Sequence, residues 1–411
     1  MQVYNLITII VVLTAAFGYI NFRFIKLPGT IGIMLISLVA SLVVIAVGKF
    51  NPILFEKARS FVGGIDFDTA LMKVMLSFLL FAGAIHIDVN KLREQMPTVI
   101  TFSTIGVVIS TFVVAGLLFL TTSLFGTPVA FMYCLLFGAL ISPTDPIAVL
   151  GILKQANIPA SLEMKISGES LFNDGVAVVV FVTIQEIIGQ GFQNVSAGDI
   201  AWLFLKEAGG GIAFGWFLGY IGFWALRSID HYIVEVGITL AIVMGGYMLA
   251  DHLHISGPLA MVVAGIITGN KSRELGMSAT TRDYIDKFWE MLDEFLNGIL
   301  FLLIGFEMLV IHFDMLVFWL GCISILIVLL ARLISVALPM MVLQFKKTFE
   351  KHAVTILTWG GLRGGISVAL ALSLPKNPMA DVCVAITYIV VLFSIIVQGL
   401  TIGKVAKALA S

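Results

Sequence analysis

The sequence predicts an all-α polytopic membrane protein with about 13 transmembrane helices, built as two inverted six-helix repeats that a linker helix joins. Three observations lead to this fold class: long apolar runs, an alternation of basic residues between the loops, and a break in two of the runs. Hydrophobic residues make up 59% of the 411 positions and charged residues 12%. A soluble core cannot take up this much apolar surface, so membrane lipid is the expected surrounding of the chain.

Each run that can cross about 30 Å of hydrocarbon at about 1.5 Å per residue is interpreted as one span. The runs cover residues 3–22, 28–48, 68–86, 97–122, 127–153, 163–189, 199–227, 232–250, 255–269, 284–311, 315–338, 352–373 and 381–403. The stretches between them, such as 49–67, are interpreted as loops, and no soluble domain is predicted. The first run has no Lys or Arg before it, which favours a span over a cleaved signal peptide.

Basic residues orient these spans, because cytoplasmic loops are enriched in Lys and Arg. One set of alternate loops and the C-terminal tail carries Arg23, Lys26, Lys91, Arg93, Lys154, Lys165, Arg227, Lys271, Arg273, Arg282, Lys346, Lys347, Lys351, Lys404 and Lys407. The other set has only Lys49, Lys57, Arg59 and Lys376. The alternation predicts a multi-pass protein of the cell membrane with its N-terminus outside and its C-terminus in the cytoplasm.

An odd number of spans permits two six-helix units of opposite orientation, residues 1–190 and 232–411, on either side of a linker helix at 199–227. Many secondary transporters have this inverted-repeat plan. The fifth span is broken at 142–146 (SPTDP) and the twelfth at 358–365 (TWGGLRGG), which are equivalent positions in the two units. Proline and glycine disfavour a continuous helix, and irregular backbone at membrane depth survives only where it is buried in protein or lines a polar site. The two broken helices are therefore expected to cross near the membrane midplane, at a binding site.

Ionisable residues inside the spans also indicate a polar site. They are Asp145, Glu169, Asp174, Arg332 and Arg363. Each costs about 2.5 to 3.5 kcal/mol at a helix centre on insertion scales. A structural ion pair would explain any one of them, but it is a weak explanation for all of them together.

The sixth span gathers four polar side chains. Ser170 and Asp174 are four residues apart, as are Glu169 and Asn173, so the four lie on adjoining strips of one helix. Facing the SPTDP break, they would surround a small volume with oxygen atoms, which suits a hard monovalent cation rather than zinc or iron. A buried carboxylate also binds protons near cellular pH. Cation and proton would then compete at one site, and no cofactor is expected besides the transported ions.

The two arginines stay charged and need anions or carbonyl dipoles nearby. If Arg363 pairs with Glu169, Asp174 remains as the exchangeable charge, which favours an electroneutral exchange of one proton for one cation. Asp145 and Arg363 also lie in the broken helices, where they can offset the partial charges of helix ends. Both roles of Arg363 stay open.

Two other function classes compete with exchange. An intramembrane aspartyl hydrolase would use Asp145 and Asp174 as a dyad, but a dyad does not call for a buried arginine. A passive channel does not need a buried carboxylate that releases its cation when it is protonated, so such a carboxylate favours exchange over a channel. The net charge of −1 and the scattered basic residues exclude nucleic acid as a partner.

Three acidic residues stand at the start of the tenth span: Glu290, Asp293 and Glu294. They form either a funnel for incoming ions or a solvated helix end.

Five stretches of the sequence resemble the NhaP-type sodium/proton antiporters. They are SPTDP at 142–146, GESLFNDGVAVVVF at 168–181, SGPLAMVVAGIITGN at 256–270, FWEMLDEFLNGILFLLIGFEM at 288–308 and TWGGLRGGISVALALSLP at 358–375. This group is the bacterial and archaeal branch of the monovalent cation:proton antiporters, which include the animal sodium/proton exchangers. The resemblance runs over essentially the whole chain, in the family's order and spacing.

The resemblance implies an antiporter, not an enzyme, that exchanges Na⁺ for H⁺, with Li⁺ and K⁺ left open and with roles in pH homeostasis and salt tolerance. Asp174 resembles the family's carrier of cation and proton. The other implied residues are Ser170, Thr144, Asp145 and Glu169 in or beside the cation site, Asn173 of the Asn-Asp pair that marks the electroneutral branch, Arg363 as the partner of the motif Glu, and Arg332 as a structural arginine. The resemblance also implies a homodimer and elevator-like movement. The chain stops soon after Lys407, so no soluble regulatory tail is expected.

Overall fold

The computed structural model describes residues 2–66, 68–126, 129–145, 153, 159–191, 195–272, 278–311, 314–344, 350, 352–375 and 377–410. Every regular element within these ranges is a helix. The predicted all-α polytopic fold is therefore confirmed, and the count of thirteen spans stays a prediction.

The helices follow one another as α1 (Gln2–Ile20), α2 (Gly29–Gly48), α3 (Pro52–Gly63), α4 (Leu76–Ile85), α5 (Val89–Thr101), α6 (Val107–Leu124), α7 (Phe131–Ile141), α9 (Ala160–Gln190), α10 (Ala197–Phe204), α11 (Gly210–Arg227), α12 (Tyr232–His252), α13 (Gly257–Ile267), α15 (Ala279–Glu307), α16 (Met315–Leu343), α17 (Ala353–Trp359), α18 (Gly365–Leu372), α19 (Pro378–Phe393) and α20 (Gly399–Ala410). Short π-helical segments extend or join several of them, at Asn21–Ile25, Asp68–Met75, Phe102–Gly106, Leu205–Gly209, Thr268–Ser272 and Ser394–Gln398.

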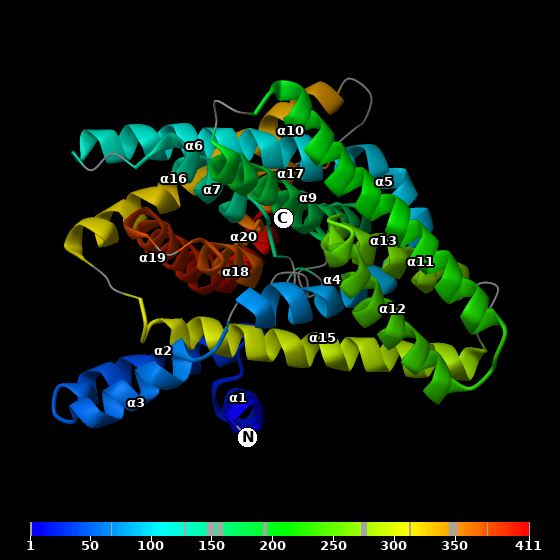
Figure 1. The fold of residues 1–411 in the computed structure, drawn as a ribbon, viewed down its shortest axis with the longest axis horizontal. Coiled ribbons are helices and arrows are strands. Elements are labelled where there is room, and N and C mark those ends of the chain that lie inside the picture. The colour runs from blue at the N-terminus through cyan, green and yellow to red at the C-terminus, as the bar shows by residue number, and fades with distance from the viewer. Residues whose placement is uncertain are drawn as a thin grey trace.

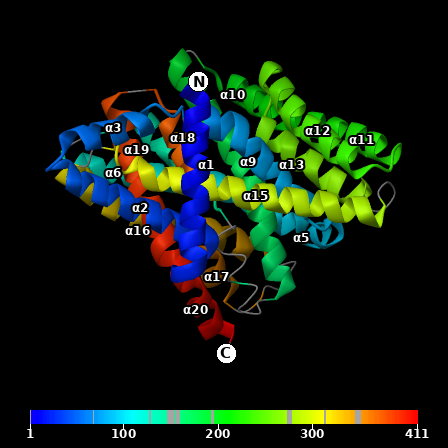
Figure 2. The ribbon, with the colours of Figure 1, turned by 90° about the horizontal axis from the view of Figure 1, so that it is seen from below.

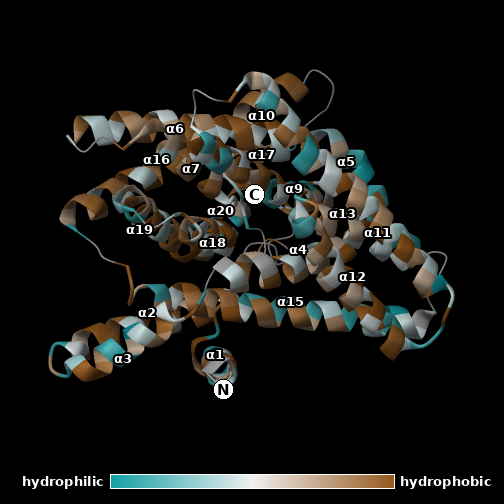
Figure 3. Ribbon diagram, in the orientation of Figure 1, coloured by the Kyte–Doolittle hydropathy of each residue, from teal (hydrophilic) through white to brown (hydrophobic). Residues whose placement is uncertain are grey.

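Eight helical stretches of the described chain are long and apolar enough to cross a membrane. They are Tyr4–Ile25, Gly29–Gly48, Val89–Leu124, Ala160–Gln190, Ala197–Arg227, Tyr232–His252, Met315–Leu343 and Pro378–Leu409. Figure 3 shows apolar residues along most of these ribbons, with many of the hydrophilic residues at helix ends and connections.

One predicted loop is wrong, because residues 52–63 of the stretch 49–67 form helix α3. The side chain of Asn51 accepts a hydrogen bond from the backbone N–H of Leu54 at 3.3 Å, and Pro52 occupies the first turn. Asn is a preferred helix cap and Pro a preferred first residue. The segment is less apolar than the spans, so a search for apolar runs misses it.

Helix α15 crosses the molecule as one long rod (Figure 1) and contacts α1, α2, α4, α12 and α18. Helix α9 contacts α5, α7 and α13 in the interior. Figure 2, which looks from below, shows α1 crossing α15, with the N- and C-termini at opposite edges of the molecule. Helices α4, α9, α15 and α18 thus surround the interior space where the polar residues of the sequence gather.

Candidate functional site

The first predicted break follows α7, which ends at Ile141. Proline lacks a backbone N–H, and Pro143 follows two residues later, so the chain leaves the helix and continues without regular structure to Asp145. Residues 146–152 and 154–158, which include the second half of the predicted fifth span, lie outside the described residues.

The second predicted break is confirmed as the gap between α17, which ends at Trp359, and α18, which begins at Gly365. The two breaks meet directly. The backbone N–H of Asp145 donates a hydrogen bond to the carbonyl oxygen of Leu362 at 2.8 Å. Each break therefore satisfies part of the free backbone of the other, as buried irregular backbone requires.

Arg363 reinforces this junction. Its side chain is 2% exposed, and Nη1 donates to the carbonyl oxygens of Ser142 and of Pro143, at 3.0 Å for Pro143. Carbonyls at the C-terminal end of a helix carry partial negative charge, so the guanidinium offsets the charge at the end of α7. This contact corresponds to the second of the two roles expected for Arg363.

The prediction that Glu169 pairs with Arg363 is wrong, because Glu169 is bound by Arg332 instead. Nη1 and Nη2 of Arg332 donate to the two carboxylate oxygens of Glu169, at 3.1 Å for the Nη2 bond. Nε of Arg332 donates to the Leu357 carbonyl at 3.3 Å. Arg332 lies on α16, which packs against α6, α17 and α19, and its side chain reaches Glu169 on α9. The Arg363 side chain instead donates to carbonyl oxygens at the end of α7. The two-pronged geometry suits a buried guanidinium–carboxylate pair.

Hydroxyl and amide groups link the first break to α9. Nδ2 of Asn173 donates to Oγ1 of Thr144 at 2.8 Å, and the Thr144 N–H donates to Oδ1 of Asn173 at 3.4 Å. The Ser170 and Thr144 hydroxyls are 3.1 Å apart. Thr144, Ser170 and Asn173 are all buried, so they form a fixed set of oxygen and nitrogen atoms beside the breaks.

Asp174 lies next to this set and faces a cavity of about 660 Å³ that Asp145 and Ser170 also line. Among the described residues, the Asp174 carboxylate has no hydrogen bond and no ion pair. The negative charge of Asp145 acts on it. A carboxylate with no fixed partner, close to a second carboxylate, favours the uptake of a cation or a proton.

Two glycines of the second break leave room for the charged side chains. A Cβ atom on Gly364 would overlap the carboxylate of Asp145, and one on Gly361 would lie 2.6 Å from Nε of Arg332. Only a residue without a side chain allows such close approach. The Gly-rich sequence at 360–365 thus has a packing reason as well as a conformational one.

Sequence reasoning missed a chain of hydrogen bonds that links the second break to Ser394 and Gln398. The Arg363 N–H donates to Oγ of Ser394 at 2.9 Å, Ser394 donates to Oε1 of Gln398 at 2.7 Å, and Nε2 of Gln398 donates to the Trp359 carbonyl at 3.0 Å. Ser394 and Gln398 lie four residues apart in the thirteenth predicted span, and this spacing was the one available signal.

The site is suited to ions that need few strong ligands. No group of three or more His, Cys, Asp or Glu side chains in the described parts of the chain is arranged to hold a metal ion. The described residues offer the carboxylate of Asp174 and the hydroxyls of Ser170 and Thr144, and such hard oxygen ligands bind hard cations and protons.

Comparisons with known proteins agree on one family. The family model described as sodium/hydrogen exchanger, transmembrane, matches residues 11–408. The chain is 49% identical to the Na(+)/H(+) antiporter NhaP of Pseudomonas aeruginosa, over 98% of this chain and 96% of that relative. It is 34% identical to the Na(+)/H(+) antiporter NhaH of Halobacillus dabanensis, over 94% of this chain and 93% of the relative.

The fold agrees as well. The solved structure of the sodium proton antiporter MjNhaP1 from Methanocaldococcus jannaschii superposes with a TM-score of 0.79 at 22% identity, and the match covers 100% of this chain and 99% of the other. The relatives are named as antiporters, which decides against the intramembrane hydrolase. The chain belongs to the sodium/hydrogen exchanger family, a family of membrane transporters and not of enzymes.

Proposed function

We propose that this protein exchanges Na⁺ for H⁺ across the cell membrane, and that cation and proton compete for the carboxylate of Asp174. The observation that carries the proposal is the contrast between two carboxylates on one helix. Glu169 is held by Arg332, whereas Asp174 has no partner among the described residues and faces the cavity. A fixed carboxylate stabilises the site, and a free one can take up and release an ion.

Oxygen atoms around Asp174 would complete the coordination of a cation. Ser170 lies one helical turn before Asp174, and its hydroxyl is 3.1 Å from that of Thr144. Asp145 lines the same cavity. Proton binding at Asp174 would remove the charge that holds the cation, so the two ions exclude each other. In alternating access, this exclusion alone couples their movements.

The stoichiometry follows from how many charges change. Glu169 stays neutralised by Arg332, and Asn173 carries no charge and is bound to Thr144. Asp174 is then the residue that alternates between cation and proton, and one positive charge crosses in each direction per cycle. The proposed exchange is therefore electroneutral and one for one. The same site would accept Li⁺ and, with a larger coordination shell, K⁺.

The family resemblance supports further parts of the proposal. These are inverted repeats at residues 1–190 and 232–411 around a linker at 199–227, a homodimer in the membrane, an outside N-terminus with a cytoplasmic C-terminus, and a role in pH homeostasis and salt tolerance. Cysteine accessibility at loop positions would test the orientation.

Proton movement in proteoliposomes tests the function directly. The purified protein is reconstituted with a pH-sensitive dye inside the vesicles, and Na⁺, Li⁺ or K⁺ is added outside. We expect the luminal pH to rise with Na⁺, and the ranking of the three responses gives the selectivity. Wild-type vesicles whose pH responds to none of the three ions would refute exchange. A sustained current on supported membranes that scales with turnover would refute electroneutrality.

A further inference from the structure

The cavity that holds Asp174 extends along one face of α15. Asp286, Asp293 and Asn297 all line it, and their spacing of seven and four residues places them on one side of a helix. Asp286 is partly exposed, and its carboxylate lies 3.8 Å from Nδ1 of the partly exposed His86. With a rise of about 1.5 Å per residue, Asp293 lies roughly 10 Å further along the helix. Asp286, Asp293 and Asn297 thus form a polar stripe along α15, which runs from the accessible end of the cavity toward its buried end.

Asn297 leaves a buried oxygen atom without a donor on this stripe. Its side chain is 1% exposed. Nδ2 donates to the backbone carbonyl of Asp293 at 2.9 Å and to its carboxylate Oδ1 at 3.1 Å. Oδ1 of Asn297 has no hydrogen-bond partner among the described residues. A buried amide oxygen without a donor is unfavourable, and a bound cation would satisfy it.

The electrostatics of the cavity favour cations at this position. The negative charge of Asp145 acts on both Asp174 and Asp293. The described residues that line the cavity include no Lys and no Arg. Walls of one sign in a low-dielectric cleft concentrate ions of the opposite sign. Asp293 therefore lies within the field that acts on Asp174, on a different helix.

We propose that the carboxylate of Asp293 and Oδ1 of Asn297 form a second binding site for a monovalent cation, between the accessible end of the cavity and Asp174. Two protein oxygens, with water in the remaining positions, suit an ion that must be released again. The inference rests on the proposed function, because the occupant would be the cation that Asp174 exchanges. It goes beyond that function in giving α15 a direct part in cation binding.

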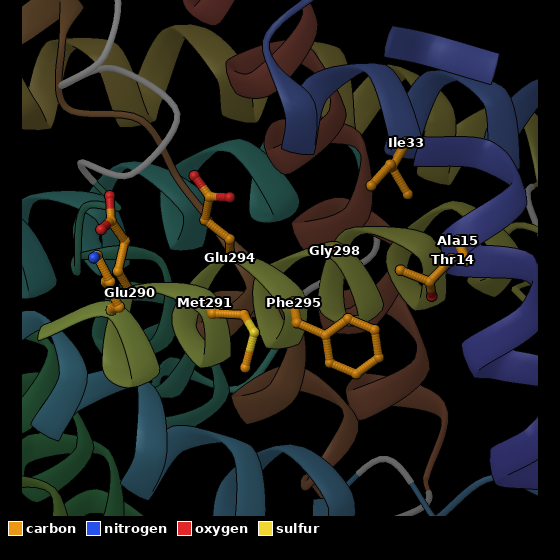
Figure 4. Close-up of a pocket in the computed structure, with 9 residues that line it drawn as sticks. Thr14, Ala15, Ile33, Glu290, Met291, Glu294, Phe295 and Gly298 are labelled. Atoms are coloured by element: carbon orange, nitrogen blue, oxygen red, sulfur yellow. The ribbon is translucent and has the colours of Figure 1, made fainter. Parts of the chain in front are cut away.

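Helix α15 also provides a matched control. Glu294 is adjacent to Asp293 in sequence but lines a separate groove of about 510 Å³, which α15 forms with α1 and α2 (Figure 4). Met291 and Phe295 of α15 and Thr14 of α1 line the same groove. Glu294 is exposed, whereas Asp293 is half-buried. Replacing Glu294 by Gln removes a neighbouring carboxylate whose charge acts on Asp293, but it removes no residue that lines the central cavity.

Equilibrium binding of radioactive Na⁺ tests the second site. The full-length protein is purified in lipid nanodiscs, and wild type, D174N, D293N, D174N/D293N and E294Q are compared at one pH. We expect D174N to retain Na⁺ binding, D174N/D293N to lose it, and E294Q to bind as wild type does. The absence of Na⁺ binding by D174N, or binding by D174N that D293N leaves unchanged, would overturn the inference.

A second variant guards against a loss caused by misfolding. Asn297→Asp in the D174N background adds a carboxylate to the second site, and more charged ligands bind a cation more tightly. We expect Na⁺ affinity to rise by about tenfold, and an unchanged or weaker affinity would contradict the site.

Failure of the second site and failure of the proposed function give different results in these experiments. Wild-type vesicles without exchange would refute that function even if D174N binds Na⁺ through Asp293, and working exchange with no binding in D174N would refute only the second site.

Discussion

Glu169 on α9 and Arg332 on α16 form a buried ion pair in which both nitrogen atoms of the guanidinium fork donate to the carboxylate. The pair is 1% and 7% exposed. It ties the helix that carries Asp174 to a helix far away in sequence. Breaking such a pair leaves an uncompensated charge in a place where water cannot reach it.

We expect Arg332→Gln to destabilise the protein by about 3 to 5 kcal/mol, because Glu169 would stay buried without its partner. The double variant Glu169→Gln with Arg332→Gln should lose less than the sum of the single losses. Thermal unfolding of the purified protein in detergent measures all four forms. Strict additivity would contradict the pair. The corresponding cycle of Glu169 with Arg363 should show the weaker coupling.

Asp174→Asn should reduce Na⁺-driven proton movement to the level of empty vesicles, since an amide binds neither a proton nor a charge-balancing cation. The protein should still fold, because the carboxylate has no partner in the described structure to lose. Dye-monitored proteoliposomes and size-exclusion chromatography report the two properties. Substantial exchange by the variant would exclude Asp174 as the carrier. Glu294→Gln, outside the cavity, should behave as wild type does.

Gly364→Ala should impair exchange without unfolding the protein. The added Cβ would overlap the Asp145 carboxylate, which then has to move within the site. Gly63→Ala on α3 is the control, because nothing lies within 4 Å of the Cβ added there. We expect a lower maximal rate of proton movement for Gly364→Ala alone. Equal rates for the two variants would mean that the position of Asp145 does not matter.

A pH dependence of stability is expected from Glu350, which lies in the connection before α17. Burial raises its pKa, but hydrogen bonds from Lys165, at 2.7 Å, and Ser161 outweigh burial, so the pKa lies below the usual value for Glu. A lowered carboxyl pKa stabilises the folded state above the unfolded pKa of about 4.3, and this stabilisation is lost as the pH falls through the folded pKa.

Glu350→Gln should therefore lower the unfolding temperature at pH 7, and the difference from wild type should shrink as the pH falls below about 4. Thermal unfolding at several pH values measures it. Asp283→Asn is the control, because its partner Lys287 is 70% exposed and exposed pairs contribute little. A difference that grows in acid would contradict the assignment.

Most of the fold could be predicted because the bilayer imposes a strong rule: an apolar run of sufficient length is a helix. The breaks were predictable from local sequence, since Pro143 and the cluster of glycines around Arg363 disfavour a continuous helix. Helix α3 was missed because it is less apolar than the spans, and the signals that mark its start are the Asn51 cap and Pro52.

It was harder to predict which residues of the candidate site bind one another than to predict which residues belong to the site. Which arginine meets Glu169 depends on how α16 and the second break are rotated about their axes, and no spacing within one segment specifies this. Asn297 gave no signal either, because a single Asn in an apolar helix is equally compatible with a packed or a solvated position. Its buried, unpartnered oxygen becomes visible only when neighbouring helices are in place.

The hydrogen bond from the Asp145 N–H to the Leu362 carbonyl has a consequence for the proposed exchange. Because the two breaks are bonded to each other, they would move as one unit in the proposed alternating access. Thr144 of the first break and Asn173 of α9, which are also bonded to each other, would move with them. The two ion gradients set the sign of net exchange in any antiporter, so such a unit would serve either direction without rearranging these contacts.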